Sequence, residues 1–418
     1  MSSSTAGVVI VGASVAGVRT AQALRREGFD GRVVLLSDEA VMPYDKPPLS
    51  KGFLAGATGP EQIALLTEAE ADELGVEVRL NSRARRLHLA EHLVELDTGE
   101  HVDYHRLVVA TGASARASTW PVSGVHVVRT MSDAQRLRAD LERGGHLVVI
   151  GAGFVGSEVA ATARTMGLQV TLVDPNPAPM TRIAGKALGA RFIRLHQDHG
   201  VDTRFGTSVL DVSRKHGRLH IDLSDGAALT ADTCVVGIGA VPNDAWLASS
   251  GVRIDNGVLC DEYCRAVGNP DVYAVGDVAR WDNPRRGVLT RHEHWTNAHE
   301  QANTVAHNIV HAEDLIAFAP IEYVWSDQYD WKIRIAGQIR VDTCDIVEVI
   351  GDEATERFAL LSSRDGASLS GIVAVNWPRA LIAGRKALAH NMSYTDVRQA
   401  IEQLLSAMPA PVAMEGAK

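Results

Sequence analysis

Two stretches of the chain share one order of apolar and polar positions. Each begins with a short run of β-branched residues, which is followed by a turn of small residues. Apolar residues then recur with a period near 3.6, and after a glycine a second run of β-branched residues ends the stretch. These stretches are residues 7–38 and 146–174. A strand, a helix and a second strand within about 30 residues form the βαβ unit of a parallel sheet. The pattern therefore predicts two such units in an α/β protein.

The rest of the chain alternates apolar and polar residues in shorter runs. Strands are expected at residues 92–99, 106–112, 219–226, 233–239 and 272–277. From residue 321 onward, short strand-like runs are separated by turns, and a helical pattern follows near residues 394–407. We therefore expect a third, C-terminal domain of mostly antiparallel α+β type.

Composition limits the class of protein. The chain has 418 residues, of which 46% are hydrophobic and 22% are charged, values that are ordinary for globular proteins and that exclude a disordered chain. At about 150 residues per domain, two to three domains are expected. The formal net charge of −10 disfavours general nucleic-acid binding, because phosphate neutralisation needs a basic surface.

Hydropathy and cysteine content suggest a cytoplasmic protein without a membrane segment. No apolar run reaches the roughly 18 residues of a membrane span, and the first positively charged side chain is Arg19, so the basic start of a secretory signal is missing. Cys234, Cys260, Cys264 and Cys344 are too few for a disulfide scaffold, and no CxxC occurs. We assign no metal ligand from the sequence.

The second repeated unit carries a complete dinucleotide-binding signature. Gly151, Gly153 and Gly156 form GxGxxG after a strand and before a helix. The glycines permit a tight turn, close approach of a pyrophosphate and close packing of helix on strand. Asp174 ends the next strand, where a carboxylate binds the adenosine ribose hydroxyls and repels a 2′-phosphate. This unit is expected to bind NADH in preference to NADPH; the alternative is a glycine-rich turn that only packs a helix.

The first repeated unit departs from this signature at one position. Gly12 and Gly17 occupy the outer positions, but Ser14 replaces the middle glycine, so a Cβ faces the expected pyrophosphate. Alignment of the two units places Ser37 opposite the acid of the second unit, with Asp38 next. We choose Asp38 as the ribose acceptor. Ser37 is the other candidate, and Asp38 would then be a solvated carboxylate in a turn.

Two short turns complete the set of nucleotide-binding segments. Ala110, Thr111 and Gly112 follow a strand after the first unit, and a later strand leads into Gly276 and Asp277. A strand that ends in Gly-Asp can direct a backbone N–H toward a pyrophosphate and a carboxylate toward a ribityl chain. Each segment alone is an ordinary turn, but their order along the chain is specific.

With these segments in this order, the chain resembles the two-dinucleotide flavoprotein reductases of the glutathione-reductase fold. Among them it resembles the NADH-dependent ferredoxin reductases that serve oxygenases and cytochromes P450. The resemblance also rests on residues 47–51 (PPLSK), 239–243 (GAVPN), 293–301 (EHWTNAHEQ) and 325–329 (WSDQY), and it covers roughly residues 6–405.

The resemblance implies two cofactors, FAD and NADH, in separate Rossmann-like domains. FAD would bind the first repeated unit together with the Gly-Asp turn, and NADH would bind the second. The FAD-binding domain would be discontinuous, at residues 1–116 and 244–320, with the NAD-binding domain at 117–243 and the α+β domain at 321–418.

The resemblance also assigns roles to individual side chains. Lys51 would favour electron density on the flavin, and Glu158 would orient both Lys51 and the nicotinamide, so these two are the expected catalytic residues. Alternatively, Glu158 only complements its helix dipole. Arg129 would bind the FAD pyrophosphate and Asp277 a ribityl hydroxyl, while Trp295 would lie beside the isoalloxazine. An exposed strand-end arginine and a core aromatic are the alternatives for Arg129 and Trp295. The other implied cofactor contacts are Val15, Ala16, Ala84, Phe154, Val155, Gly239, Glu293, His294, Ala298 and Trp325.

Cysteine placement separates the chain from the disulfide reductases of this fold, which carry a redox cysteine pair after the first module. Residues 41–51 contain no cysteine, and Cys260 and Cys264 lie far downstream in a strand-like run. We expect these two cysteines to be packing thiols.

The implied activity is hydride transfer from NADH followed by delivery of single electrons to an iron–sulfur ferredoxin, most simply of [2Fe–2S] type, that feeds a cytochrome P450 or another oxygenase. A NADH oxidase or diaphorase would use the same residues, whereas a redox-sensing binding protein resembling apoptosis-inducing factor would need a targeting segment and a basic surface.

Because iron–sulfur ferredoxins are usually acidic, docking of the ferredoxin is expected to use a local cationic patch. Its candidates are Arg285, Arg286, Lys332 and Arg334, and the alternative is that these are ordinary solvated charges.

Overall fold

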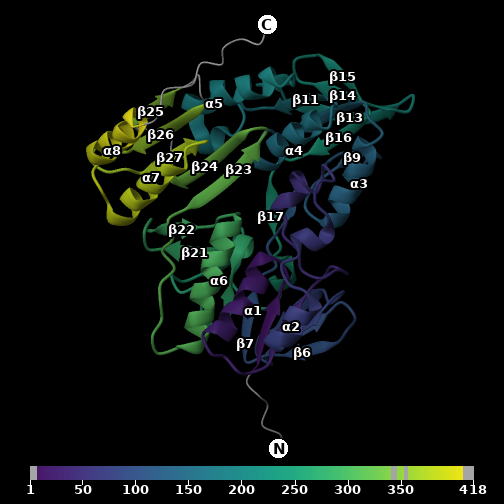
Figure 1. Cartoon of the computed structure of the whole chain (residues 1–418). Helices are drawn as coiled ribbons and strands as arrows, with labels where there is room; N and C mark the ends of the chain where they lie inside the picture. Colours follow the sequence, from purple (N-terminus) through teal and green to yellow (C-terminus); the bar gives the residue numbers. More distant parts are fainter. Residues whose placement is uncertain (1–6, 340–345, 353–355, 408–418) are drawn as a thin grey trace, which may run out of the picture. The chain divides into compact units, whose positions relative to one another are not determined.

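The computed structural model describes residues 7–339, 346–352 and 356–407, with the backbone alone for residues 182–187 and 352. Two compact units divide the chain (Figure 1). The first contains residues 1–117, 127–138 and 238–320, and the second contains residues 118–126, 139–237 and 321–418. Within the described residues, no helix is both long enough and apolar enough to cross a membrane.

The first unit is built on a nine-stranded sheet. Its strands are β1 (Val8–Val11), β2 (Val33–Leu36), β3 (Val76–Arg79), β7 (Arg106–Val109), β18 (Val258–Cys260), β19 (Arg265–Ala266), β20 (Asn269–Ala274), β21 (Ala279–Asn283) and β22 (Val288–Thr290). The spatial order is β22-β21-β18-β19-β20-β7-β1-β2-β3, and neighbours from β20 to β3 run parallel. Every side chain of β1 and β2 is buried, as expected for parallel strands covered on both faces.

Helices and smaller sheets complete the first unit. Its helices are α1 (Val15–Arg26), α2 (Glu68–Leu74) and α6 (Trp295–Val310), with 3₁₀ turns η1 (Pro47–Ser50), η2 (Pro60–Ile63), η3 (Ala245–Leu247) and η4 (Gly276–Val278). The smaller sheets pair β4 (Ala84–His88) with β5 (Leu93–Leu96) and β6 (His101–Asp103), and β8 (Ala113–Ala115) with β17 (Ala240–Pro242). Because α1 joins the parallel strands β1 and β2, the first βαβ prediction is confirmed.

The second unit contains a five-stranded parallel sheet in the order β12-β11-β10-β16-β9. Its elements are β9 (Val125–His126), β10 (His146–Ile150), α4 (Phe154–Thr165), β11 (Gln169–Asp174), α5 (Thr181–Asp198), β12 (Asp202–Phe205) and β16 (Thr233–Val236). An antiparallel sheet of β13 (Val209–Lys215), β14 (Arg218–Leu223) and β15 (Ala228–Ala231) follows β12. Helix α3 (Met131–Leu141) begins in the first unit and ends in the second. The second βαβ prediction is confirmed by β10, α4 and β11.

The C-terminal residues form a five-stranded antiparallel sheet in the order β23-β24-β27-β26-β25. Its elements are β23 (Tyr323–Gln328), β24 (Trp331–Gly337), β25 (Ile346–Asp352), β26 (Arg357–Ser363), β27 (Gly371–Val375), α7 (Pro378–His390) and α8 (Tyr394–Ser406). The antiparallel α+β prediction and the helix near residues 394–407 are confirmed; α7 was not anticipated.

One face of this C-terminal sheet packs on α5. Leu188 and Phe192 from α5 share a buried cluster with Trp331 and Ile333 of β24 and with Leu360 of β26. Residues 321–418 therefore belong to the same compact unit as residues 139–237. The assignment of domains to cofactors, with limits at residues 116, 243 and 320, stays a prediction.

Candidate functional site

The turn between β1 and α1 can be made only by glycine at two places. A Cβ on Gly12, whose φ is +112°, would lie 2.2 Å from the carbonyl oxygen of Ala110. A Cβ on Gly17 would lie 1.9 Å from the carbonyl oxygen of Gly12. The glycine turn thus packs directly on the turn of Ala110, Thr111 and Gly112. The two sequence segments therefore lie together in the fold.

A small cavity lies beside this turn. Ser14, the N-cap residue of α1, lines it together with Ser37, Glu39, Tyr44 and Lys46. The Tyr44 hydroxyl donates to Glu39 Oε2 at 2.5 Å, and Lys46 Nζ lies 3.0 Å from Glu39 Oε1. Burial lowers the pKa of the Lys46 ammonium, and the Glu39 carboxylate opposes that shift. These hydroxyl, carboxylate and ammonium groups can form hydrogen bonds with the hydroxyl groups of a ligand that binds beside the turn.

The sequence alone pointed to Asp38, but the acid beside this cavity is Glu39. Burial alternates along the segment: Ser37 is buried, Asp38 is exposed and Glu39 is half-buried. Ser37 and Glu39 line the cavity, whereas Asp38 does not. The role of Asp38 as the ribose acceptor stays a prediction.

Arg129 and Asp277 come together from distant parts of the first unit. Arg129 Nη2 lies 3.0 Å from Asp277 Oδ2. Burial raises the pKa of the Asp277 carboxyl, and the Arg129 guanidinium opposes this shift. A Cβ on Gly276, whose φ is +78°, would lie 3.0 Å from Ala16 Cβ and 3.4 Å from Ala298 Cβ, so η4 packs closely between α1 and α6. Arg129, before α3, and Asp277, in η4 after β20, are the kinds of side chain that bind the pyrophosphate and ribityl groups of FAD.

The segment PPLSK forms η1 and is anchored by apolar packing. Tyr44, Leu49 and Phe53 share a buried cluster with Met131. Lys51 follows η1, and its Nζ donates to the carbonyl oxygen of Pro47 at 3.2 Å. The lysine predicted to act near the flavin is therefore held by its own turn.

Trp295 begins α6, and its indole has neighbours over the ring and a hydrogen-bond partner at its polar edge. The indole Nε1 donates to Asp45 Oδ1 at 2.7 Å, and burial raises the pKa of that carboxyl. The guanidinium of Arg19 lies 5.8 Å from the ring centroid, and the His299 ring stacks at 5.4 Å. Trp295 is half-buried, so it is not a fully buried core aromatic.

The other predicted contacts of the first unit vary in burial. His294 is the N-cap residue of α6, and Glu293 is exposed and accepts from Arg291 at 2.7 Å. Val15 and Ala84 are half-buried and pack against the core of the unit.

In the second unit the glycine turn leaves open space where a ligand would approach. A Cβ on Gly156 would lie 1.8 Å from the carbonyl oxygen of Gly151, whereas a Cβ on Gly153 would meet nothing within 4 Å. Phe154 packs against the core that contains α5, and Val155 is 40% exposed. The space at Gly153 fits the pyrophosphate of a dinucleotide above the N-terminus of α4.

Asp174 is buried at the end of β11 and holds the glycine turn. Its two carboxylate oxygens accept from the backbone N–H of Ala152, at 2.7 Å, and from the backbone and side-chain N–H groups of Asn176, each at 2.7 Å. Oδ1 accepts both bonds from Asn176 and Oδ2 accepts the one from Ala152, so Oδ2 keeps a further lone pair for a ribose hydroxyl of NADH.

Glu158 is only 5% exposed, and a C-terminal strand orients it. Ser326 on β23 donates its hydroxyl to Glu158 Oε1 at 2.7 Å, and Gln328 donates to Ser326 Oγ at 3.1 Å. Trp325, the neighbour of Ser326, is half-buried, with its ring 6.0 Å from that of Tyr323. Because Lys51 and Glu158 lie in different compact units, their pairing stays a prediction.

Asn243, the last residue of GAVPN, clamps the turn at Thr111. Its side-chain amide donates to the carbonyl oxygen of Thr111 at 2.8 Å, and the Thr111 hydroxyl donates to the carbonyl oxygen of Asn243 at 2.8 Å. Gly239, with φ of +107°, has open space where a Cβ would stand. The sequence identified this segment by resemblance only and missed the positioning role of Asn243.

The cysteines that the structure describes are buried thiols. Cys234, Cys260 and Cys264 are at most 1% exposed and form no disulfide. Burial raises the pKa of Cys264 to about 12, so it stays protonated and unreactive. The packing role expected for Cys260 and Cys264 is confirmed, and Cys344 lies outside the described residues.

Two glycine-rich βαβ turns, one in each compact unit, define a protein with two dinucleotide-binding modules. The chain belongs to the pyridine nucleotide-disulphide oxidoreductase family, which matches residues 6–302, and residues 323–403 match the reductase C-terminal family. The resemblance inferred from the motifs is therefore confirmed.

Curated relatives and solved structures agree over most of the chain. Rhodocoxin reductase of Rhodococcus erythropolis is 35% identical over 93% of this chain and 90% of its own. The ferredoxin–NAD(+) reductase component of the anthranilate 1,2-dioxygenase system of Burkholderia cepacia is 35% identical over 91% of this chain and 93% of its own. The ferredoxin reductase for the CYP199A2 system from Rhodopseudomonas palustris superposes with a TM-score of 0.89 and 31% identity, covering 94% of this chain and 99% of that one.

Proposed function

We propose that the protein is an FAD-dependent oxidoreductase that takes electrons from NADH and delivers them singly to an iron–sulfur ferredoxin of an oxygenase or cytochrome P450 system. The observation that carries the proposal is the presence of two βαβ glycine turns, the first with Ser14 at its middle position, each beside a carboxylate suited to a ribose, Glu39 in one unit and Asp174 in the other. The relatives named above are reductases of the same kind.

The first unit would hold FAD. Gly12, Ser14 and Gly17 would approach the pyrophosphate, and Arg129 would neutralise it. In place of Asp38, Glu39 would accept the adenosine ribose hydroxyls, because Glu39 lines the cavity beside Ser14. FAD, when bound, supplies the exchange between a two-electron donor and one-electron acceptors.

The second unit would hold NADH. The open position at Gly153 receives the pyrophosphate, and the buried Asp174 accepts the ribose hydroxyls and excludes a 2′-phosphate. Glu158 would position the nicotinamide amide, and the Ser326 hydroxyl fixes the direction of its carboxylate. Lys51 would place a positive charge beside the ring that accepts the hydride.

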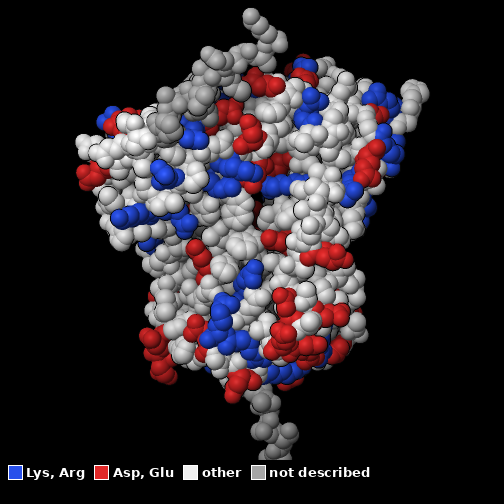
Figure 2. Space-filling view, in the orientation of Figure 1, with Lys and Arg blue, Asp and Glu red and all other residues white. Residues whose placement is uncertain are grey.

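Docking of an acidic ferredoxin would use local positive charge. Figure 2 shows Asp and Glu gathered over the region of α2, whose exposed acids are Glu68, Glu70, Asp72 and Glu73. Arg285 is exposed in the β21–β22 turn, whereas Arg334 Nη1 lies 2.7 Å from Asp327 Oδ1 and Lys332 Nζ lies 3.5 Å from Asp327 Oδ2. Of the cationic candidates, Arg285 is therefore the better probe, because its replacement leaves the Asp327 ion pairs intact.

We also propose that the cofactor domains follow the limits at residues 116, 243 and 320 and that the protein works in the cytoplasm. Limited proteolysis, with mass analysis of the fragments, would test the domain limits. Fractionation of the source cells would test the second, and recovery outside the cytoplasmic fraction would reject it.

The activity is tested by steady-state NADH turnover with a panel of [2Fe–2S] and [3Fe–4S] ferredoxins. We expect fast reduction of at least one [2Fe–2S] ferredoxin and slow reoxidation of the reduced protein in air. Fast reoxidation in air without preference for any ferredoxin would instead indicate a NADH oxidase or diaphorase. Absence of bound flavin after refolding with FAD would reject both.

A further inference from the structure

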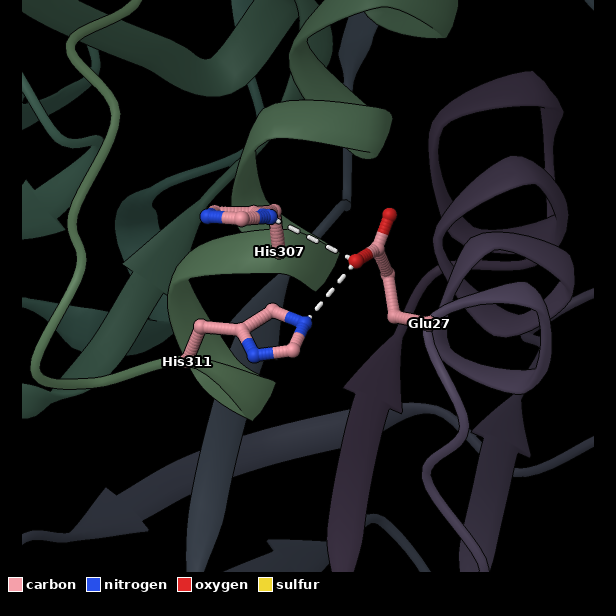
Figure 3. Close-up of side chains that lie close together, drawn as sticks. All are labelled: Glu27, His307 and His311. Carbon is pink, nitrogen blue, oxygen red and sulfur yellow. Dashed lines mark hydrogen bonds and ion pairs between the residues drawn. The ribbon is translucent and has the colours of Figure 1, made fainter.

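A separate group of metal-ligating side chains lies at the carboxyl ends of α1 and α6. Glu27 follows the last residue of α1, His307 lies in the last turn of α6, and His311 follows one turn later (Figure 3). Glu27 Oε2 lies 3.4 Å from His307 Nδ1 and 3.1 Å from His311 Nε2. The geometry points to a binding site for a divalent transition-metal ion, zinc in character, that joins the ends of these two helices.

The hydrogen bonding of His307 indicates that its Nδ1 is prepared as a ligand. His307 Nε2 lies 2.9 Å from the carbonyl oxygen of Asp314. A carbonyl oxygen can only accept, so Nε2 carries the hydrogen, and in the neutral ring Nδ1 keeps its lone pair. That lone pair faces the Glu27 carboxylate, so the two atoms are placed to share a bound cation. A metal-bound histidine commonly donates its other N–H to a carbonyl oxygen in this way.

The spacing of the three ligand atoms matches a small tetrahedral site. With metal–nitrogen distances of about 2.0–2.1 Å, two ligands of a tetrahedral zinc lie about 3.3 Å apart. The two distances at Glu27, 3.4 and 3.1 Å, are close to this value, and all three ligand atoms lie within 4.8 Å of one another. The His307 and His311 rings, with centroids 4.6 Å apart, can converge on one ion through small side-chain rotations.

The donor set selects the class of metal. Two imidazoles and one carboxylate suit Zn²⁺, Ni²⁺, Co²⁺ or Cu²⁺, whereas Mg²⁺ and Ca²⁺ prefer oxygen ligands alone. The His311 side chain is 43% exposed and that of Glu27 is 34% exposed, so an ion can enter from solvent and can complete its coordination with water.

A metal at this place would brace the helix pair that frames the first glycine turn. Along the same pair, Arg26 Nη2 donates to Asn303 Oδ1 at 2.8 Å. At the amino ends, Ala16 and Ala298 pack on either side of Gly276. The ion would thus connect the far ends of two helices whose near ends adjoin the proposed FAD site.

A second group in the same unit provides an internal control. His88 and Glu95 lie 2.8 Å apart, and His101 lies near them on β6. Among residues 7–339, 346–352 and 356–407, no carbonyl oxygen accepts from a ring nitrogen of His88 or His101 in the way that Asp314 accepts from His307, so we expect weaker binding.

The test is calorimetric titration of the FAD-loaded protein, freed of any affinity tag and of metal, with ZnCl₂ near neutral pH. We expect one zinc ion per chain whose dissociation constant rises at least tenfold in His311→Ala and in Glu27→Gln, while His101→Ala leaves it unchanged. Circular dichroism confirms the fold of each variant; because His311 is exposed, its replacement should not disturb folding. Thermal unfolding should show a rise in midpoint with Zn²⁺ in the wild type but not in His311→Ala, and no rise with Ca²⁺.

The proposal is overturned if wild type and His311→Ala give the same titration, or if His101→Ala removes the binding instead. It is also overturned if Ca²⁺ stabilises the protein as much as Zn²⁺. Glu27→Gln keeps the size of the side chain, so loss of binding there reports the charge of the ligand. None of these readouts uses turnover, so the result does not depend on the proposed activity.

Discussion

At the scale of single residues, the nucleotide-binding carboxylates owe their orientation to partners that the local sequence does not show. Glu158 accepts a hydrogen bond from the Ser326 hydroxyl, and Asp174 accepts one from the backbone N–H of Ala152. Both carboxylates are buried and hydrogen-bonded, so their oxygens are fixed before any ligand arrives. Substitutions at these positions should therefore act on alignment more than on folding.

Replacement Glu158→Gln keeps the size of the side chain but removes the charge that would orient the nicotinamide. We expect anaerobic flavin reduction by NADH to slow by about tenfold or more, because misalignment is costly in hydride transfer. Ser326→Ala should give a smaller loss, since it removes only the orienting donor. Stopped-flow absorbance measures both rates, with FAD content as the control. An unchanged rate in Glu158→Gln would leave Glu158 as a helix-dipole partner.

Asp174 is the residue that we expect to set the choice of nicotinamide cofactor. The wild-type protein should be reduced far more efficiently by NADH than by NADPH, because a buried carboxylate repels a 2′-phosphate. Asp174→Asn should lower this preference by roughly tenfold, because it removes the negative charge; its single amide oxygen can still accept from Ala152 or from Asn176, but not from both. The measurement compares the rates of anaerobic flavin reduction by NADH and by NADPH at matched concentrations. Equal efficiency of both cofactors in the wild type would contradict the assignment.

At the scale of elements, the two βαβ turns use the same backbone contact for different ligands. Gly17 and Gly156 each lie so close to the preceding glycine carbonyl that a Cβ would stand 1.9 or 1.8 Å from it. Such a clash can be relieved only by moving the helix away from its strand. The two turns can therefore be disabled separately.

Gly17→Ala should purify with reduced FAD content. Gly156→Ala should keep FAD but bind NADH at least tenfold more weakly, because only the second turn is displaced. The control is Gly59→Ala, where a Cβ would meet nothing closer than 3.9 Å. Absorbance of the flavin and titration with NADH distinguish the variants. FAD loss in Gly156→Ala but not in Gly17→Ala would reverse the assignment of cofactors.

Helix α5 makes the stability of the second unit depend on pH. Burial lowers the pKa of His196 on this helix to about 4 from the ordinary 6.5. Between these two values the unfolded chain binds a proton that the folded chain does not, so stability falls as pH drops through this window. From pH 7 to pH 5 the expected loss is about 2 kcal/mol.

Unfolding curves at both pH values measure this loss, and His196→Gln should reduce it. His390→Gln serves as the control, because His390 is exposed on α7. If His196→Gln and wild type lose the same stability, another group titrates in this range.

At the scale of the whole molecule, the formal charge of −10 opposes an acidic partner. Ferredoxin reduction should therefore depend on local cations and slow as salt is added, whereas turnover with ferricyanide changes less. Arg285→Glu should reproduce the selective loss, mainly through the association rate. Arg334→Glu would also break the Asp327 ion pair, so it is the less specific variant. If neither salt nor Arg285→Glu affects ferredoxin turnover, docking is apolar or lies elsewhere.

The sequence determined the features that depend on neighbours a few residues apart. Periodicity fixed both βαβ units and the antiparallel C-terminal sheet, since burial of one face imposes its period on the chain. Gly17 and Gly156 were readable for the same reason, because a Cβ on either would clash with the glycine carbonyl that precedes it in its own turn. Neither feature needed knowledge of any distant segment.

Only the tertiary structure decided which side chains meet across long stretches of chain. Ser326 reaches Glu158 across 168 residues, Asn243 reaches Thr111 across 132, and Glu27 meets His311 across 284. It also placed Glu39, and not Asp38, in the lining of the cavity beside Ser14, because the path of the backbone sets which side chains face a cavity. Such contacts leave no local periodicity in the sequence, since their energy comes from packing of separate elements against each other.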